Sequence, residues 1–173
     1  MLGVKNLKIL PAAGEERVEP GLLPEDVVLN LSAQKAREVQ VRAGGGCVVI
    51  GADTVVSLDG QIFGKPRDAG DAGRMLRALS GREHRVYTGL TVISEGEELQ
   101  GTEVTAVRFR ALTEAEIAAY VETGEPMDKA GAYGVQGLAS LFVSGITGDF
   151  FNVMGLPLCR LGQMLAQFGV ALL

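Results

Sequence analysis

Apolar residues recur at helical spacing in four segments of this chain. These segments cover residues 24–42, 69–79, 113–123 and 157–168. Each begins with residue types that favour a helix start, namely Pro24, Asp68, Thr113 with Glu116 three residues on, and Pro157. The pattern therefore predicts four helices that each bury one face.

Runs of β-branched and apolar residues predict strands in other parts of the chain. These runs cover residues 8–10, 48–56, 84–93, 101–109 and 141–146. The pairs Asp59-Gly60 and Glu95-Gly96 are typical of turns and predict two hairpins, the first of which brings Lys65 back beside strand 48–56. Because strands and helices do not alternate strictly, the order of elements predicts an α/β or α+β fold around one sheet.

Length and charge narrow the class of protein. At 173 residues the chain is long enough for one large core, and we expect a single domain. The net charge of -5 argues against a surface that binds DNA or RNA through their phosphates. A few lysines inside a cleft can still bind a small anion.

The compartment and the cysteines can be predicted as well. The first ten residues lack the apolar run of a signal peptide, and no apolar run reaches a membrane-spanning length, so we expect a cytoplasmic protein without a membrane partner. Cys47 and Cys159 are predicted to be small core hydrophobes in a reducing compartment, not a disulfide or a metal site. The single histidine, His84, excludes a histidine-rich metal site and is assigned a structural role.

Asp53 is the polar residue that most needs an explanation, because it follows the buried run Val48-Val49-Ile50 in the same strand. A buried carboxylate is costly unless a cation, a metal or hydrogen-bond donors accompany it, so we expect Asp53 where the strand borders a cleft. Lys65 is the nearest cationic candidate. The alternative is that Asp53 only accepts hydrogen bonds from backbone groups at a strand end.

Other lysines and glycine-rich segments are weaker candidates for a binding role. Lys35 projects from the first helix, and its simplest interpretation is a solvated surface lysine. Glycines 44–46 precede a strand and predict a turn, and Gly64-Lys65 lacks the following Ser or Thr of a Walker motif. The glycine-rich segment 128–137 predicts a loop whose backbone closely approaches another group.

Six motifs occur together and in order along the chain. They are Gly51-Ala52-Asp53-Thr54-Val55-Val56, Gly64-Lys65-Pro66-Arg67-Asp68, Leu79-Ser80-Gly81-Arg82-Glu83-His84, Gly124-Glu125-Pro126-Met127-Asp128-Lys129-Ala130-Gly131, Tyr133-Gly134-Val135-Gln136-Gly137 and Asn152-Val153-Met154-Gly155-Leu156-Pro157. Together they resemble the Maf family of nucleoside triphosphate pyrophosphatases, from about Leu7 onward. The resemblance implies one α/β domain over residues 1–173, with a central mixed, twisted sheet flanked by helices, as in Maf and ITPase-like proteins.

The resemblance also implies an activity and a set of site residues. The activity is hydrolysis of a nucleoside triphosphate between the α and β phosphates, with Mg²⁺ or Mn²⁺ as cofactor, in nucleotide-pool cleansing. Asp53 matches the family's catalytic aspartate and is also assigned as a metal ligand, and Glu16 matches an acidic residue near the metal. Lys35 and Lys65 match lysines that bind the phosphates. The resemblance does not determine the oligomeric state, and a homodimer is one of the possibilities.

Specificity is a further implication of the resemblance. Thr54 and Gln136 resemble markers of the family branch that acts on dTTP and UTP. The Gln136 amide carries both a donor and an acceptor, which suits the imide edge of thymine or uracil. The alternative is that Gln136 only braces its own loop.

Two other functions remain as alternatives. One is a nucleotide-binding regulator of septum formation with little turnover. The other is a phosphatase that uses Asp53 as a covalent nucleophile, although such an enzyme would normally have a second aspartate where Val55 stands.

The family pattern opens with a strand that runs into a Ser-x-Ser-Pro-Arg-Arg stretch at a helix start, and Met1-Leu2-Gly3-Val4 matches the end of that helix. We therefore expect the sequence to begin late relative to the family, through a start codon assigned too late or natural loss of the segment. Because that stretch would supply N–H groups and arginines to a triphosphate, this 173-residue chain is expected to bind and hydrolyse nucleotide poorly.

Overall fold

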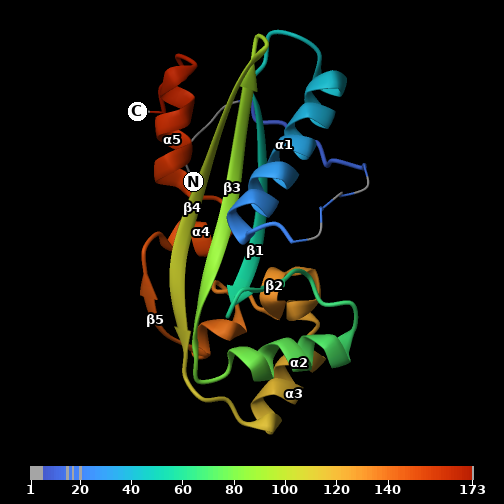
Figure 1. The fold of residues 1–173 in the computed structure, drawn as a ribbon, viewed down its shortest axis with the longest axis vertical. Coiled ribbons are helices and arrows are strands. Elements are labelled where there is room, and N and C mark those ends of the chain that lie inside the picture. The colour runs from blue at the N-terminus through green and yellow to red at the C-terminus, as the bar shows by residue number, and fades with distance from the viewer. Residues whose placement is uncertain (1–5, 15, 17, 20, 173) are drawn as a thin grey trace.

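A five-stranded sheet forms the centre of the structure, a computed structural model that describes residues 6–14, 16, 18–19 and 21–172. The strand order is β2-β1-β3-β4-β5. The strands are β1 (Val49–Leu58), β2 (Gln61–Phe63), β3 (Glu83–Ser94), β4 (Glu97–Phe109) and β5 (Val143–Thr147). Figure 1 shows β1, β3 and β4 as long ribbons that run most of the length of the molecule.

The predicted α/β class is confirmed, but the described sheet is antiparallel throughout and not mixed. Short turns explain this difference, because a strand that follows a two-residue turn must run back along its neighbour. Asp59-Gly60 joins β1 to β2, and Glu95-Gly96 joins β3 to β4. All four turn residues have positive φ, as the hairpin turns that match strand twist require. Both predicted hairpins are thus confirmed.

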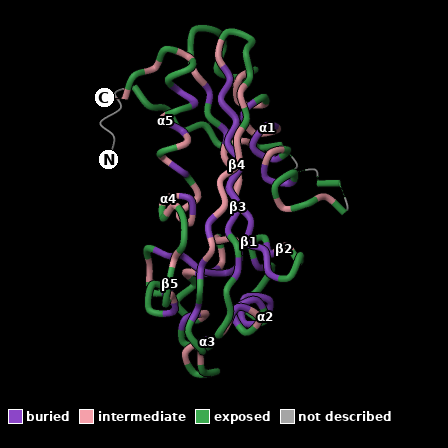
Figure 2. Tube along the Cα trace, turned by 60° about the vertical axis from the view of Figure 1, so that its left-hand side comes forward, coloured by how far each residue is buried: buried purple, intermediate pink, exposed green. Residues whose placement is uncertain are grey.

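Helices cover both faces of the sheet and its lower end. They are α1 (Pro24–Ala43), α2 (Ala69–Leu79), α3 (Glu114–Glu122), α4 (Phe150–Val153) and α5 (Leu158–Gln167). Figures 1 and 2 show α1 and α5 on opposite sides of the long strands, with α2 and α3 at the other end. Successive side chains of β3 point to opposite faces of the sheet, which explains the two layers. The Thr91 hydroxyl forms a hydrogen bond with Ser32 on α1, whereas the neighbouring Leu90 and Val92 pack against α5 on the other face.

The predicted helix starts are confirmed. Asp68 caps α2 by accepting a hydrogen bond from the Asp71 N–H at 2.8 Å, and Thr113 with Glu116 forms the capping box of α3. The last helix begins at Leu158, directly after Pro157. Across the described residues, no helix combines the length and apolar content needed to cross a membrane.

Several local predictions were wrong. Residues 8–10 form no strand, and Ile9 is 85% exposed, because no neighbouring strand pairs with them in the described sheet. Cys47 and Cys159 are free and exposed rather than buried, since Cys47 lies in the turn before β1 and Cys159 on the outer side of α5. Short 3₁₀ turns occur where the sequence predicted loop or strand, at Glu125–Asp128, Ala130–Ala132 and Leu138–Leu141.

The backbone of α1 packs directly on the sheet at two glycines. A Cβ at Gly51 would lie 2.3 Å from the carbonyl oxygen of Ser32, and a Cβ at Gly89 would lie 2.2 Å from that of Val28. Any side chain at either position would therefore push the helix outward. The buried hydroxyls of Ser32 and Thr91, 2.9 Å apart, hold α1 in register with β3. This close approach determines which residues of α1 can reach the sheet.

Replacing Gly89 by alanine should lower the free energy of unfolding by about 1–3 kcal/mol, the usual cost of overpacking a core. Urea denaturation followed by circular dichroism measures this change. Gly45→Ala is the matched control, because a Cβ there meets no atom within 4 Å. Equal unfolding midpoints for the two variants would contradict the close approach of α1 to β3.

Candidate active site

Two carboxylates share one lysine ammonium beside β1. The Nζ of Lys35, on α1, donates a hydrogen bond to Oδ1 of Asp53, on β1, and forms an ion pair with Oε1 of Glu16 at 2.9 Å. The Asp53 side chain is only 11% exposed, whereas that of Glu16 is 56% exposed. Lys65 was the expected cationic partner of Asp53, but the direct partner is Lys35, because α1 packs so closely on β1.

The buried pair shifts both pKa values. Burial raises the pKa of Asp53 above its ordinary value, and the opposing effect of Lys35 does not cancel it. Burial alone would lower the pKa of Lys35, but its bonds to Asp53 and Glu16 outweigh burial and raise that pKa. Asp53 is therefore a better proton acceptor than an exposed aspartate, and the lysine beside it stays charged.

The edge of β1 is open beside Asp53 and Thr54. β2 pairs only with residues 56–58, and in the described part of the chain no other strand pairs with β1 on that side. Successive strand residues point to opposite faces, so Asp53 faces α1 while Thr54 faces the layer that contains α4. There the Thr54 Oγ1 lies 2.9 Å from the Thr88 Oγ1. The open edge lets side chains from both faces reach one cavity.

A cavity of about 650 Å³ lies along this open edge. Four of the predicted site residues line it, namely Asp53, Thr54, Lys65 and Gln136. The other two, Lys35 and Glu16, are not part of the lining and join the site through their ion pairs beside Asp53. The structure thus brings all six predicted residues into one neighbourhood, four of them around the cavity itself.

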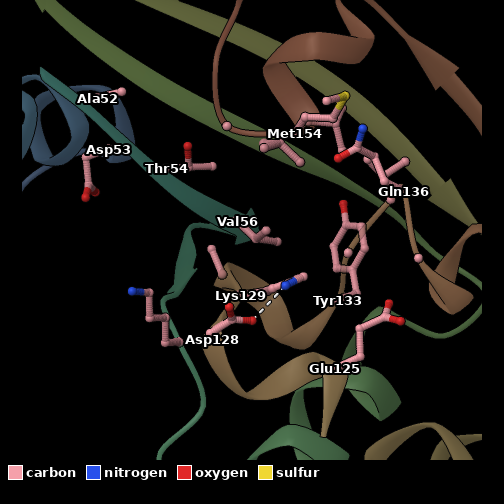
Figure 3. A pocket seen from close by; sticks show the side chains of 18 residues that line it. Ala52, Asp53, Thr54, Val56, Glu125, Asp128, Lys129, Tyr133, Gln136 and Met154 are labelled. Atoms are coloured by element: carbon pink, nitrogen blue, oxygen red, sulfur yellow. Dashed lines mark hydrogen bonds and ion pairs between the residues drawn. The ribbon is translucent and has the colours of Figure 1, made fainter. Parts of the chain in front are cut away.

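The two ends of the cavity differ in chemistry. Figure 3 shows Asp53 at one end and Gln136 with Met154 at the other, with Asp128 and Lys129 between them. The Lys65 ammonium interacts electrostatically with the carboxylates of Asp53 and Asp128. A carboxylate and a lysine therefore face an uncharged amide across the same space.

Buried hydrogen bonds fix the wall behind Thr54. Asn152 is fully buried in α4, and its side-chain NH₂ donates to the Val86 carbonyl and the Thr105 hydroxyl, both at 3.0 Å. The Thr88 hydroxyl, which also contacts Thr54, donates a hydrogen bond to the backbone carbonyl oxygen of Asn152 at 3.2 Å. This network connects the cavity wall to the middle of the sheet.

His84 supports the opposite wall. Its Nε2 lies 2.9 Å from the hydroxyl of Tyr133, a cavity residue, and its ring packs edge-on against Phe109. Burial lowers the pKa of His84 to about 4, so the ring is neutral at pH 7. These contacts agree with the structural role assigned to His84.

Sequence reasoning gave no role to four residues that line the cavity, namely Glu125, Asp128, Lys129 and Met154. Lys129 donates a hydrogen bond to Asp128 at 2.7 Å. All four lie within the motifs quoted above, but irregular turns have no periodicity that marks which side chains face a ligand. The available signal was the unusual density of charged residues directly before a glycine-rich loop.

Two carboxylates, Asp53 and Glu16, are the candidates for holding a metal ion. Among residues 6–172 that the structure describes, no group of three or more His, Cys, Asp or Glu side chains is arranged to hold a metal. Asp53 and Glu16 nevertheless converge on the same ammonium. Mg²⁺ typically uses one or two protein carboxylates and completes its shell with phosphate oxygens and water. This oxygen-only pair therefore fits a hard divalent cation that binds together with a phosphate ligand.

A buried carboxylate and lysines at one end of a cavity, with an amide at the other, suit a ligand that joins an anionic chain to a hydrogen-bonding ring. The fold and the cavity are of the kind found in α/β proteins that bind small molecules. The chain belongs to the Maf family, since the family model described as Maf-like protein matches residues 1–168.

Similar proteins are named dTTP/UTP pyrophosphatase. The relatives from Thermococcus gammatolerans, Symbiobacterium thermophilum and Bacillus pumilus are 53%, 48% and 47% identical to this chain over 155, 168 and 156 residues, respectively. These alignments cover 90%, 97% and 90% of this chain and 82%, 86% and 82% of the relatives. The likeness thus extends over most of each protein.

Replacing Lys35 by methionine should raise the pKa of Asp53 further, because it removes the cation that favours the carboxylate while burial remains. Any step that needs ionised Asp53 then shifts to higher pH. A ¹³C NMR titration of the Asp53 carboxyl group measures the pKa directly.

Lys8→Met is the control for this titration, because it removes an exposed lysine that forms no ion pair in the described structure. It should leave the pKa of Asp53 at the wild-type value. An unchanged or lower Asp53 pKa in Lys35→Met would show that the two side chains are not paired in solution.

Proposed function

We propose that this chain hydrolyses dTTP and UTP to the nucleoside monophosphate and pyrophosphate. One arrangement carries the proposal: the buried Asp53, paired with Lys35, borders the same cavity as Gln136. Membership of the Maf family and the names of its relatives support the same reaction. The roles given to individual residues below are part of the proposal.

The reaction needs a proton acceptor close to the α-phosphorus. The water oxygen forms a bond to that phosphorus, the bond to the oxygen that bridges the α and β phosphorus atoms breaks, and pyrophosphate leaves. Asp53 accepts the proton of the attacking water. Its raised pKa supports this role, because a general base works best when its pKa approaches the working pH.

Two lysines serve the phosphates. Lys65 lines the cavity and has no ion-pair partner in the described chain, so its ammonium is available to the triphosphate. Lys35 holds the Asp53 carboxylate in place and adds its charge to the same end of the cavity. Positive charge fixed there stabilises the negative charge that develops on the leaving pyrophosphate.

Asp53 and Glu16 would hold the divalent cation, Mg²⁺ or Mn²⁺. When bound, the cation would neutralise part of the phosphate charge. Lys35 lies between the two carboxylates and keeps them close together without it.

The base is read at the opposite end of the cavity. The Gln136 side chain is exposed toward the cavity and forms no hydrogen bond in the described structure, so its donor and its acceptor are both available. This pair suits the alternating carbonyl and N–H groups of thymine and uracil. Thr54 lines the same cavity from β1. A site built on such bonds rejects bases that leave them unpaired.

Product analysis separates this proposal from the two alternatives. Release of pyrophosphate from dTTP or UTP supports the pyrophosphatase. Release of orthophosphate would instead support a phosphatase that uses Asp53 as nucleophile. Tight nucleotide binding with neither product would support a regulator with little turnover.

Asp53→Asn should fold normally and lose turnover by about 10² or more, the scale expected when a general base is removed. Pyrophosphate release from dTTP measures the loss. Asp59→Asn, the same change in the exposed turn after β1, should keep wild-type activity. If Asp53→Asn were as active as Asp59→Asn, the catalytic role of Asp53 would be wrong.

The wild-type chain should hydrolyse dTTP and UTP faster than ATP and GTP in the presence of Mg²⁺ or Mn²⁺. Gln136→Ala should reduce this preference by about tenfold, the value of one or two hydrogen bonds to the base. Gln163→Ala, on the exposed side of α5, is the matched control. Equal rates for all four nucleotides in the wild type would refute base reading by Gln136.

A further inference from the structure

We infer that Glu125 is a positioning residue that holds the loop of residues 133–137 in the conformation in which Gln136 reads the base. The inference rests on the proposed function, and it adds a residue to the base-binding end of the cavity. Glu125 lies at the start of the 3₁₀ turn Glu125–Asp128 and lines the cavity. Figure 3 shows it on the same side as Tyr133 and Gln136, with Asp53 on the opposite side.

Glu125 and Tyr120 together hold both ends of this loop. Glu125 Oε1 accepts a hydrogen bond from the Tyr120 hydroxyl at 2.9 Å, and Oε2 accepts one from the Leu138 N–H at 3.0 Å. The Tyr120 hydroxyl in turn accepts a bond from the Gly134 N–H at 3.2 Å. One carboxylate is thus connected to the chain on either side of Gln136, two residues before it and two residues after it.

The contacts favour a carboxylate over a neutral polar side chain. Both groups that face Glu125, the Tyr120 hydroxyl and the Leu138 N–H, act as donors. Burial raises the pKa of Tyr120, and the Glu125 charge raises it further, so the hydroxyl keeps its proton and donates it. A glutamine could still accept the Leu138 N–H, but it would remove the negative charge that strengthens this bond, and its NH₂ would have to reverse the direction of the bond to the Tyr120 hydroxyl.

The loop is shaped to receive this carboxylate. A Cβ at Gly137 would lie 2.1 Å from Glu125 Oε1, so a larger residue at position 137 would displace the carboxylate from its present place. Gly134 and Gly137 also give the loop high backbone freedom, which an external anchor must restrict before Gln136 can present its amide in one orientation. Gln136 forms no hydrogen bond of its own within the described structure, so the bonds of Glu125 anchor the loop.

Base selectivity in Glu125→Gln tests the inference, with UTP and CTP as substrates because these nucleotides differ only at the base edge that Gln136 faces. The ratio of kcat/KM for UTP to that for CTP should fall about tenfold, mainly through a higher KM for UTP, since small misplacements of a binding group are costly. Glu122→Gln is the control. It makes the same change at an exposed residue of α3 that has no hydrogen bond or ion pair in the described structure, and it should leave the ratio unchanged.

A general structural defect would slow both substrates and leave their ratio unchanged. An unchanged ratio in Glu125→Gln, with or without a drop in overall activity, would therefore overturn the inference. A fall in the ratio without loss of thermal stability supports it.

Hydrogen exchange tests whether Glu125 anchors the loop, and it does so without a measurement of enzymatic activity. The Gly134 and Leu138 amides should exchange at least about tenfold faster in Glu125→Gln than in the wild type or in Glu122→Gln, because their bonds are weakened. Tyr120→Phe removes the hydroxyl between Glu125 and Gly134 and should accelerate exchange of the Gly134 amide in the same way. This variant replaces Glu125→Gln in the test if Glu125→Gln does not fold. Unaltered exchange would overturn the inference, whereas a wild-type chain that hydrolyses no nucleotide would refute the proposed function alone.

Discussion

The buried ion pair between Lys35 and Asp53 is the constraint on which the rest of the site depends. A carboxylate inside a sheet is costly unless a cation reaches it, and the cation must come from an element that can approach the sheet closely. α1 does so because Gly51 and Gly89 have no side chains to hold it away. Two glycines in the strands are therefore as necessary to this site as the charged residues themselves. The pair leaves Asp53 desolvated, with a raised pKa, beside a lysine that remains charged.

The open edge of β1 determines where the cavity forms. A strand normally presents alternate residues to separate layers, and a closed sheet would keep Asp53 and Thr54 apart. Because β2 pairs only with residues 56–58, both side chains reach the same space in the described structure. The layers of the fold then contribute different chemistry, with lysines and carboxylates at one end and the Gln136 loop at the other. Rigid elements place the charged groups, whereas the end that contains Gln136 depends on a loop that Glu125 and Tyr120 anchor.

Local signals in the sequence predicted local structure well. The capping residues Asp68 and Thr113 mark the starts of α2 and α3, and the turns at residues 59–60 and 95–96 mark the hairpins. Predictions failed where the outcome depended on contacts elsewhere. Residues 8–10 have strand-like composition but lack a paired neighbour in the described sheet, and Cys47 and Cys159 are apolar enough for a core but lie where the chain meets solvent.

The sequence by itself determined the α/β class, the helices α1, α2, α3 and α5, both hairpins, the family and the six candidate site residues, whereas the short helix α4 was not predicted. It could do so because capping, turn chemistry and side-chain period act over a few residues, and because six motifs in register are specific. Only the tertiary structure decided that Lys35, and not Lys65, pairs with Asp53, and that Glu125 anchors the loop that carries Gln136. Periodicity tells which face of an element a residue occupies, but the partner on that face is chosen by how closely two elements pack. At this site, packing distance is set by glycines that carry no chemistry of their own.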